Sequence, residues 1–151
     1  MMRAFTSYCF LIGFFWLSTT LQAAVYNDAL TYSANGMLVQ KYRLKIIAEN
    51  IANVATHMTD RGEPYRKKML LVVPDKKGVR VAGVAESQAP FGQIYDPSHV
   101  FSDRNGYLYL PNFELNDEMV NLAYTNLLYE ANTTVFKSSK QMFQNTLELL
   151  K

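Results

Sequence analysis

The C-terminal end of the chain constrains its fold more than any other feature. Residues 113–151 contain no proline and no glycine, and large apolar side chains recur there at every seventh position. One row consists of Leu115, Leu122, Tyr129, Phe136, Phe143 and Leu150, and a second row consists of Leu128, Val135, Met142 and Leu149. This repeat is typical of a helix that buries a stripe against another helix, and at ~1.5 Å per residue it would span roughly 50–55 Å. We expect Asn116 or Asp117 to cap its start.

The N-terminal part of the folded chain, residues 24–57, has a similar pattern. It contains no proline, and Leu30, Met37, Leu44 and Ile51 lie seven residues apart, with Ile47 and Val54 at the second position of the repeat. Gly36 and several polar residues weaken the first half of the pattern. The segment is therefore predicted to be a second long helix with a stripe to bury.

The middle of the chain, residues 58–112, changes character. It holds all five prolines, and strand-like runs lie at Tyr65–Val73, Val79–Val84 and Tyr107–Leu110. Asn105-Gly106 is a tight-turn dipeptide directly before the last run. These features predict a small β-rich module with a thin core that would be marginally stable alone.

The predicted fold class is therefore α+β, with long N- and C-terminal helices that pair as an antiparallel helical hairpin or coiled coil and a small β-rich insert between them. A module of this size cannot cover both apolar stripes. Periodicity alone does not distinguish helices that pack on each other or on a partner from helices that fold back onto their own sheet. Both arrangements remain open from the pattern.

Residues 1–23 are predicted to be a secretory signal peptide. Arg3 precedes the continuous apolar run Cys9–Leu17, and small residues at Ala23 and Ala24 offer a cleavage site. An uncleaved anchor over Ala4–Leu21 is the alternative, although that segment is short for a membrane span. Because the single cysteine lies in this run, a cleaved chain would have no disulfide and no thiolate metal site.

Catalytic and ligand-binding motifs are not evident. Asp96, Ser98 and His99 are adjacent in a proline-containing turn, which favours turn chemistry over a catalytic triad. The Asp103–Glu114 spacing fits a calcium loop, but Leu108 stands where that loop needs glycine. The net charge of +2 is too small to indicate a nucleic-acid partner. We expect no catalytic residues, no metal, no cofactor, no nucleic acid and no small-molecule substrate.

Several ordered blocks resemble the flagellar rod, hook and hook-associated axial proteins. The segment Ala29–Thr56 reads ALTYSANGMLVQKYRLKIIAENIANVAT and resembles their N-terminal motif, while Glu118–Asn121 and Tyr129–Asn132 resemble their EMV and YEAN blocks. The stretch Gly62–Lys67, with Tyr95–His99 and Pro111-Asn112 after it in the same order, is most similar to the small proximal rod members. The chain departs from the family at Glu49 and Ala55, where asparagine is usual, and in its secretion-type leader.

The resemblance implies a structural, non-enzymatic subunit of the flagellar basal body in the periplasmic space. Its partners would be copies of itself and other rod proteins, with membrane contact only through an uncleaved N-terminal segment. The expected assembly residues are Leu30, Met37, Leu44, Ile47, Asn50, Ile51, Asn53, Val54, Leu122, Tyr129, Glu130, Asn132, Phe136 and Phe143. Among them Asn50, Asn53, Glu130 and Asn132 are expected to specify register, since polar groups in a helical seam fix alignment. The alternative is a monomeric binding domain or hydrolase, secreted or periplasmic.

Overall fold

The computed structural model describes residues 28–149, which form an α+β fold with two long helices and a small β insert between them. The N-terminal helix covers residues 28–52. It is followed by β1 (Lys68–Asp75), β2 (Gly78–Glu86), β3 (Gly92–Tyr95), β4 (Tyr107–Leu110) and α2 (Leu115–Glu148). The predicted signal peptide and Leu150 lie outside the described residues. Within residues 28–149, no helix combines the length and the hydropathy needed to cross a membrane.

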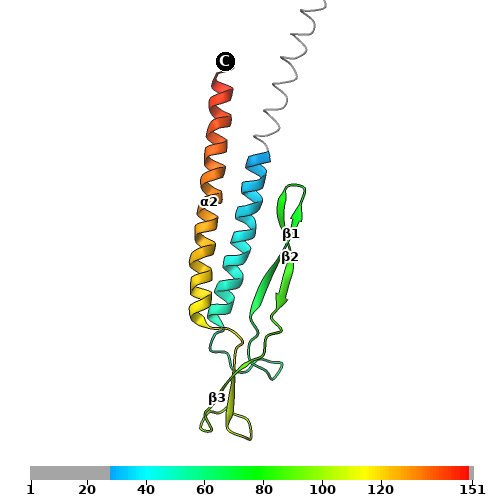
Figure 1. Ribbon diagram of the computed structural model, residues 1–151, viewed down its shortest axis with the longest axis vertical. Coiled ribbons are helices and arrows are strands. Elements are labelled where there is room, and N and C mark those ends of the chain that lie inside the picture. Colours follow the sequence, from blue (N-terminus) through cyan, green and yellow to red (C-terminus); the bar gives the residue numbers. More distant parts are fainter. Residues whose placement is uncertain (1–27, 150–151) are drawn as a thin grey trace, which may run out of the picture.

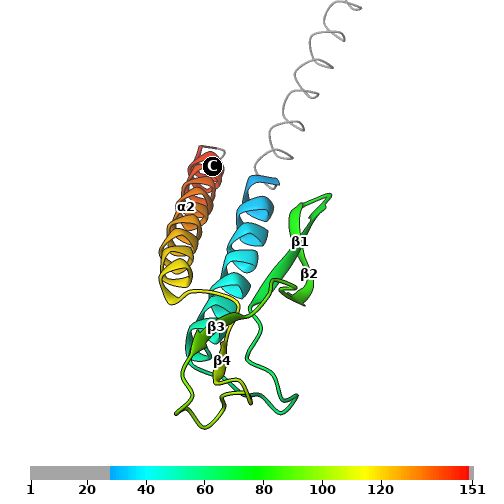
Figure 2. The ribbon, with the colours of Figure 1, turned by 60° about the horizontal axis from the view of Figure 1, so that its bottom comes forward.

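The elements lie side by side along one long axis. In Figures 1 and 2 the N-terminal helix (blue to cyan) has α2 (yellow to red) on one side and the β1–β2 hairpin on the other. The β3–β4 ribbon lies at the end of the helices where α2 begins. Within the described residues, β1 and β2 form one two-stranded sheet, and β3 and β4 form a separate one. The helices are thus not wrapped around a shared sheet.

The β1–β2 hairpin is antiparallel, and its pairing runs from Lys68 opposite Glu86 to Asp75 opposite Gly78. Gly78 closes the turn with a φ of 101°, a conformation that suits glycine. A side chain at this position would also lie 2.8 Å from the Tyr32 ring. The turn is fastened to the N-terminal helix, because Tyr32 Oη donates to the Lys76 carbonyl at 3.4 Å and Asn35 Nδ2 donates to the Lys77 carbonyl at 2.8 Å. The hairpin therefore follows the helix instead of projecting away from it.

The strand predictions are confirmed in outline. The run Tyr107–Leu110 is β4, and Val79–Val84 lies within β2, whereas the first run begins as a strand only at Lys68. The partner of β4, β3, was not predicted, because its four exposed residues carry no alternating apolar pattern. Gly106 lies in a turn as expected, with a φ of 83°, but the connection from β3 spans residues 96–106 and is not a two-residue hairpin loop.

The expected helix cap at Asn116 or Asp117 is wrong. Helix α2 begins at Leu115, after the extended residue Glu114, whose side chain makes no capping hydrogen bond. Asn116 and Asp117 lie inside the first turn instead. Asp117 and Glu118 there place negative charge near the positive end of the helix dipole, which is a favourable position for an acid.

Asn53 makes side-chain hydrogen bonds at the C-terminal end of the N-terminal helix. Its Nδ2 donates to the Glu49 carbonyl at 2.8 Å, and its Oδ1 accepts from Thr56 Oγ1 at 3.3 Å. These contacts provide side-chain bonds at the helix end, which Ala55 cannot supply. Glu49, in the last turn of this helix, forms an ion pair with Lys68 of β1.

The hydrophobic core is small. The buried apolar residues within the described range are Val39, Ile46, Ile47, Tyr65 and Leu108. Many large apolar side chains remain exposed on both helices, and residues 140–149 of α2 are exposed throughout. The free chain thus leaves uncovered much of the apolar surface that its sequence provides.

Candidate assembly site

A buried polar cluster joins the N-terminal helix, β1 and α2. At its centre is Asn50, whose exposed fraction is 1%. Its Nδ2 donates to Glu118 Oε2 at 2.9 Å and to the Lys68 carbonyl at 3.0 Å. Its Oδ1 accepts from Tyr65 Oη at 3.1 Å and from the Lys68 amide at 3.0 Å. Both donors and both acceptor positions of the Asn50 amide are therefore used.

Glu118 of α2 brings a charge into this cluster, which we call the junction (Asn50, Tyr65, Lys67, Lys68, Glu118 and Asn121). Its side chain is 1% exposed and forms an ion pair with Lys67 Nζ at 2.6 Å, while Asn121 Nδ2 donates to it at 3.2 Å. Burial raises the pKa of this carboxyl, but the hydrogen bonds from Lys67 and Asn50 and the charge of Lys67 outweigh burial. The pKa of Glu118 therefore lies below its ordinary value, and the group stays ionised.

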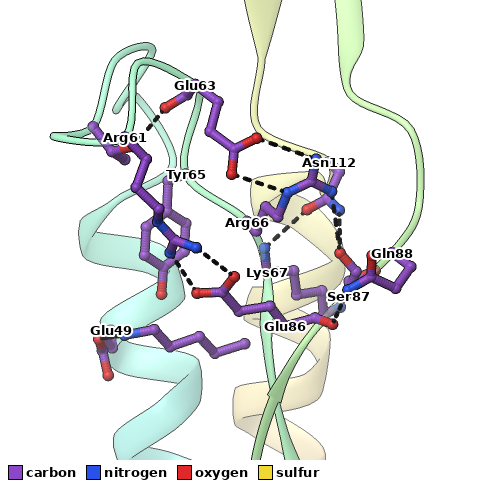
Figure 3. A network of polar contacts seen from close by, with 12 residues as sticks. Glu49, Arg61, Glu63, Tyr65, Arg66, Lys67, Glu86, Ser87, Gln88 and Asn112 are labelled. Carbon is purple, nitrogen blue, oxygen red and sulfur yellow. Dashed lines mark hydrogen bonds and ion pairs between the residues drawn. The ribbon is translucent and has the colours of Figure 1, made fainter.

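A second layer of polar contacts surrounds the base of the hairpin (Figure 3). Asn112 Oδ1 accepts from the Lys67 amide at 2.8 Å, and Asn112 Nδ2 donates to the Ala89 carbonyl at 3.0 Å. Asn112 therefore ties the segment before α2 to the residues just before β1 and just after β2. Nearby, Arg61 pairs with Glu86 through two bonds of 2.6 and 3.0 Å. These contacts fix where α2 starts relative to β1.

Tyr65 links the two layers. Its hydroxyl donates to Asn50, and its ring meets Phe113 edge to face, with centroids 6.1 Å apart. Burial, with the charges of Glu49, Glu86 and Glu118, raises the pKa of Tyr65 to about 12. The hydroxyl thus keeps its proton and acts as a donor to Asn50.

The lowered pKa of Glu118 predicts an acid-labile contribution to stability. A carboxyl whose folded-state pKa lies below its unfolded value of 4.5 stabilises the fold fully above that value and loses the contribution as pH falls below it. The variant Glu118→Gln should be less stable than the unchanged chain near neutral pH, and the difference should shrink between about pH 5 and about pH 3. Urea unfolding across this range measures the effect.

The matched control for this experiment is Glu130→Gln, because Glu130 is an exposed carboxyl on the same helix. Near neutral pH its free energy of unfolding should equal that of the unchanged chain, because the side chain is exposed. A constant difference between Glu118→Gln and the unchanged chain at all pH values would show that the Glu118 charge does not stabilise the fold.

The two helices also meet farther from the junction, at Gly36 and Asn132. A side chain at Gly36 would lie 2.6 Å from Asn132 Oδ1, so glycine is what lets α2 come this close. Beside it, Thr133 Oγ1 is 3.3 Å from Met37 Sδ. Gly36 lies within the N-terminal motif Ala29–Thr56 and Asn132 lies within the YEAN block, so this contact joins two of the sequence motifs.

The most buried residues of α2 are polar. Glu118, Thr125 and Ser139 are its buried residues, and the half-buried Asn132 completes a row with seven-residue spacing. This row lies three residues after the predicted apolar row that starts at Leu115. Apolar periodicity does not reveal this row, because its members are polar. The seven-residue spacing from Glu118 to Ser139 is the signal that the sequence offers.

The expected assembly residues fall into three groups. Ile47 and Asn50 are buried, and Asn50 lies at the junction. Half-buried positions are Leu30, Met37, Leu44, Ile51, Asn53, Val54, Leu122, Asn132 and Phe136. Tyr129, Glu130 and Phe143 are exposed. The structure thus brings Asn50 to Glu118 and Asn132 to Gly36, while Asn53 serves the end of its own helix and Glu130 faces outward.

A different stripe of α2 carries large apolar side chains that are exposed. Val120, Tyr124, Leu127, Val135 and Met142 have exposed fractions of 68%, 58%, 64%, 51% and 51%. Their spacings of three, four, seven and eight residues place them on one face of the helix. We call this face the outer stripe. Exposed apolar surface of this extent and continuity is typical of a site that binds another protein.

Comparison with known proteins gives a consistent result. No protein-family model matches the chain. It is 35% identical over 146 residues to the flagellar basal-body rod protein FlgC of Borreliella burgdorferi, which covers 82% of this chain and 96% of that protein. The identity to FlgC of Salmonella typhimurium is 36% over 123 residues, with 78% and 92% covered. For FlgC of Agrobacterium fabrum it is 32% over 132 residues, with 83% and 95% covered. The chain therefore belongs to the FlgC family of flagellar basal-body rod proteins.

Proposed function

We propose that this chain is a structural subunit of the flagellar basal-body rod and acts by packing its helices in a tubular axial assembly for flagellum-dependent motility. Its partners would be further copies of itself and other rod proteins, in the periplasmic space. Contact with the membrane would occur only through residues 1–23, if they remain attached. Membership of the FlgC family supports the rod assignment.

The outer stripe is the observation that carries this proposal. Five large apolar residues, half or more exposed, follow one face of α2, whereas the same helix turns a polar row toward its own chain. Burying each such side chain stabilises an assembly by about 1.5–3 kcal/mol. An enzyme or a solitary binding domain gains nothing from leaving this surface in water.

We further propose that the two helices form an antiparallel coiled coil whose register is set by polar contacts. Residue 50 lies opposite residue 118, and residue 36 lies opposite residue 132, so the numbers rise along one helix as they fall along the other. A displacement by one turn would break the hydrogen bond between the buried side chains of Asn50 and Glu118, which is costly. Asn50 and Asn132 are thus the residues proposed to hold the alignment.

Incorporation of variants into rods tests the proposal. Two charges on the outer stripe, Leu127→Glu with Val135→Glu, should prevent the chain from entering purified basal bodies. The free energy of unfolding of the free chain should change little, because both side chains are already exposed. Immunodetection of the chain in isolated basal bodies and a swimming assay provide the readouts.

The matched control is Asn126→Glu, which adds a charge at an exposed polar position on another face of α2. It should enter basal bodies normally. Normal incorporation and swimming of the double variant would contradict the rod proposal. That result would instead favour the alternative, a monomeric binding domain or hydrolase.

A further inference from the structure

The turn of the β1–β2 hairpin carries cations without partners. Lys76, Lys77 and Arg80 are exposed, and none of them belongs to an ion pair within residues 28–149. The backbone of the turn is nevertheless fixed, because Tyr32 and Asn35 bond the carbonyls of Lys76 and Lys77. Val79 adds an apolar side chain that is 37% exposed. We call this set (Lys76, Lys77, Val79 and Arg80) the hairpin tip.

A hollow with two acidic residues in its lining lies at the start of α2. It has a volume of about 550 Å³, and Val54, Phe91, Leu110 and Phe113 contribute apolar lining. Glu114 and Asp117 line it as well, and both are exposed. Within the described part of the chain, neither carboxylate has an ion-pair partner. Arg66 lies over the Phe91 ring at 4.1 Å and is already paired with Glu63.

We propose that the hairpin tip of one copy docks in the hollow of a second copy, with Lys77 and Arg80 near Glu114 and Asp117 and with Val79 against the apolar lining. This inference rests on the proposed rod function and names the contact between successive copies. Unpaired charges of opposite sign, each beside apolar surface, are the pattern of complementary docking patches. The tip is held in place beforehand, so little conformational freedom is lost on binding.

The tip and the hollow of one copy are too far apart to meet. The tip is fastened at Tyr32 and Asn35, whereas the hollow is lined by Val54, beyond the other end of the same helix. At ~1.5 Å per residue, Asn35 and Ala52 are separated by roughly 25 Å. Figure 1 shows the hairpin turn and the start of α2 toward opposite ends of the N-terminal helix. A contact between two different surfaces of identical subunits is head to tail, and its repetition gives an open helical assembly.

Charge exchange tests the pairing in cells that lack their own copy of this chain. Lys77→Glu alone and Glu114→Lys alone should each reduce the amount of the chain in purified basal bodies by on the order of tenfold, since like charges would then meet. The double variant should restore most of the incorporation. Arg104→Glu makes the same change of charge at an exposed loop position and should have no effect.

Cross-linking provides a second readout that does not depend on the effect of charge on folding. In a Cys9→Ser background, Lys77→Cys and Asp117→Cys are placed on separate, differently tagged copies and expressed together. We expect isolated basal bodies to contain a disulfide-linked dimer that carries both tags. Two results would overturn this inference alone, provided that the unchanged chain is incorporated. The first is a cross-link from the tip to another protein, and the second is the absence of both the cross-link and the charge rescue. Absence of the unchanged chain from basal bodies would overturn the rod proposal, and the inference with it.

Discussion

Replacement of Asn50 by alanine is expected to lower the free energy of unfolding of the full chain by about 4 kcal/mol. The loss is large because Asn50 is buried and bonds three other residues, namely Glu118, Tyr65 and Lys68. Alanine would leave the Tyr65 hydroxyl, the amide and carbonyl of Lys68 and one oxygen of Glu118 without this partner. Each unsatisfied buried group costs about 1–3 kcal/mol, and partial relaxation reduces the sum. Urea unfolding at neutral pH measures the change.

Asn35→Ala is the matched control for this prediction. Asn35 lies on the same helix and also bonds the hairpin, but through one exposed hydrogen bond to the Lys77 carbonyl. Its loss should cost about 0.5–1.5 kcal/mol. Equal effects of the two substitutions would show that the junction does not connect the three elements in the way described.

Replacement of Gly36 by valine is expected to destabilise the chain by about 2 kcal/mol, although valine is the better helix former. The reason is steric: the new Cβ would approach Asn132 Oδ1 to 2.6 Å, so the helices must separate or Asn132 must change rotamer. Shortening the neighbour in the double variant with Asn132→Ala should recover much of the loss. Thermal or urea unfolding of the single and double variants forms a double-mutant cycle.

The matched control is Gly83→Val in β2, where an added side chain meets nothing within 4 Å. It should leave stability unchanged or raise it, since β-branched residues suit strands. If Gly36→Val is harmless, or if Asn132→Ala does not compensate, the proposed close approach of the helices at this position is wrong.

Much of the architecture could be predicted from the sequence because its main signals are local. Proline-free runs with apolar residues at helical spacing mark the helices, and the runs around Val79 and Tyr107 mark two strands. β3 escaped prediction because its four residues are exposed and owe their conformation to pairing with β4. The start of α2 was misplaced because Asn112, two residues before Glu114, is bonded to the hairpin and sets the entry of the chain.

The candidate site was less predictable. Asn50 was named as a site residue through its motif, whereas Glu118 was noted only within the EMV block. Its pairing with Asn50 was not predicted, because a charged residue gives no apolar periodicity. The charge of Glu118 is paired with Lys67, the residue before β1, at 2.6 Å. The outer stripe was hidden for another reason. Val135 and Met142 belonged to a predicted row, yet only the structure distinguishes a row facing the other helix from one facing solvent.

The rod proposal requires that the outer stripe is uncovered in the free chain and covered in the assembled rod. Rates of maleimide labelling at Leu127→Cys, in a Cys9→Ser background, test this most directly, with Asn126→Cys as the reference for general access to α2. We predict rapid labelling of both positions in the free chain and strong protection of position 127 in isolated rods. Equally rapid labelling of position 127 in both states would contradict the claim.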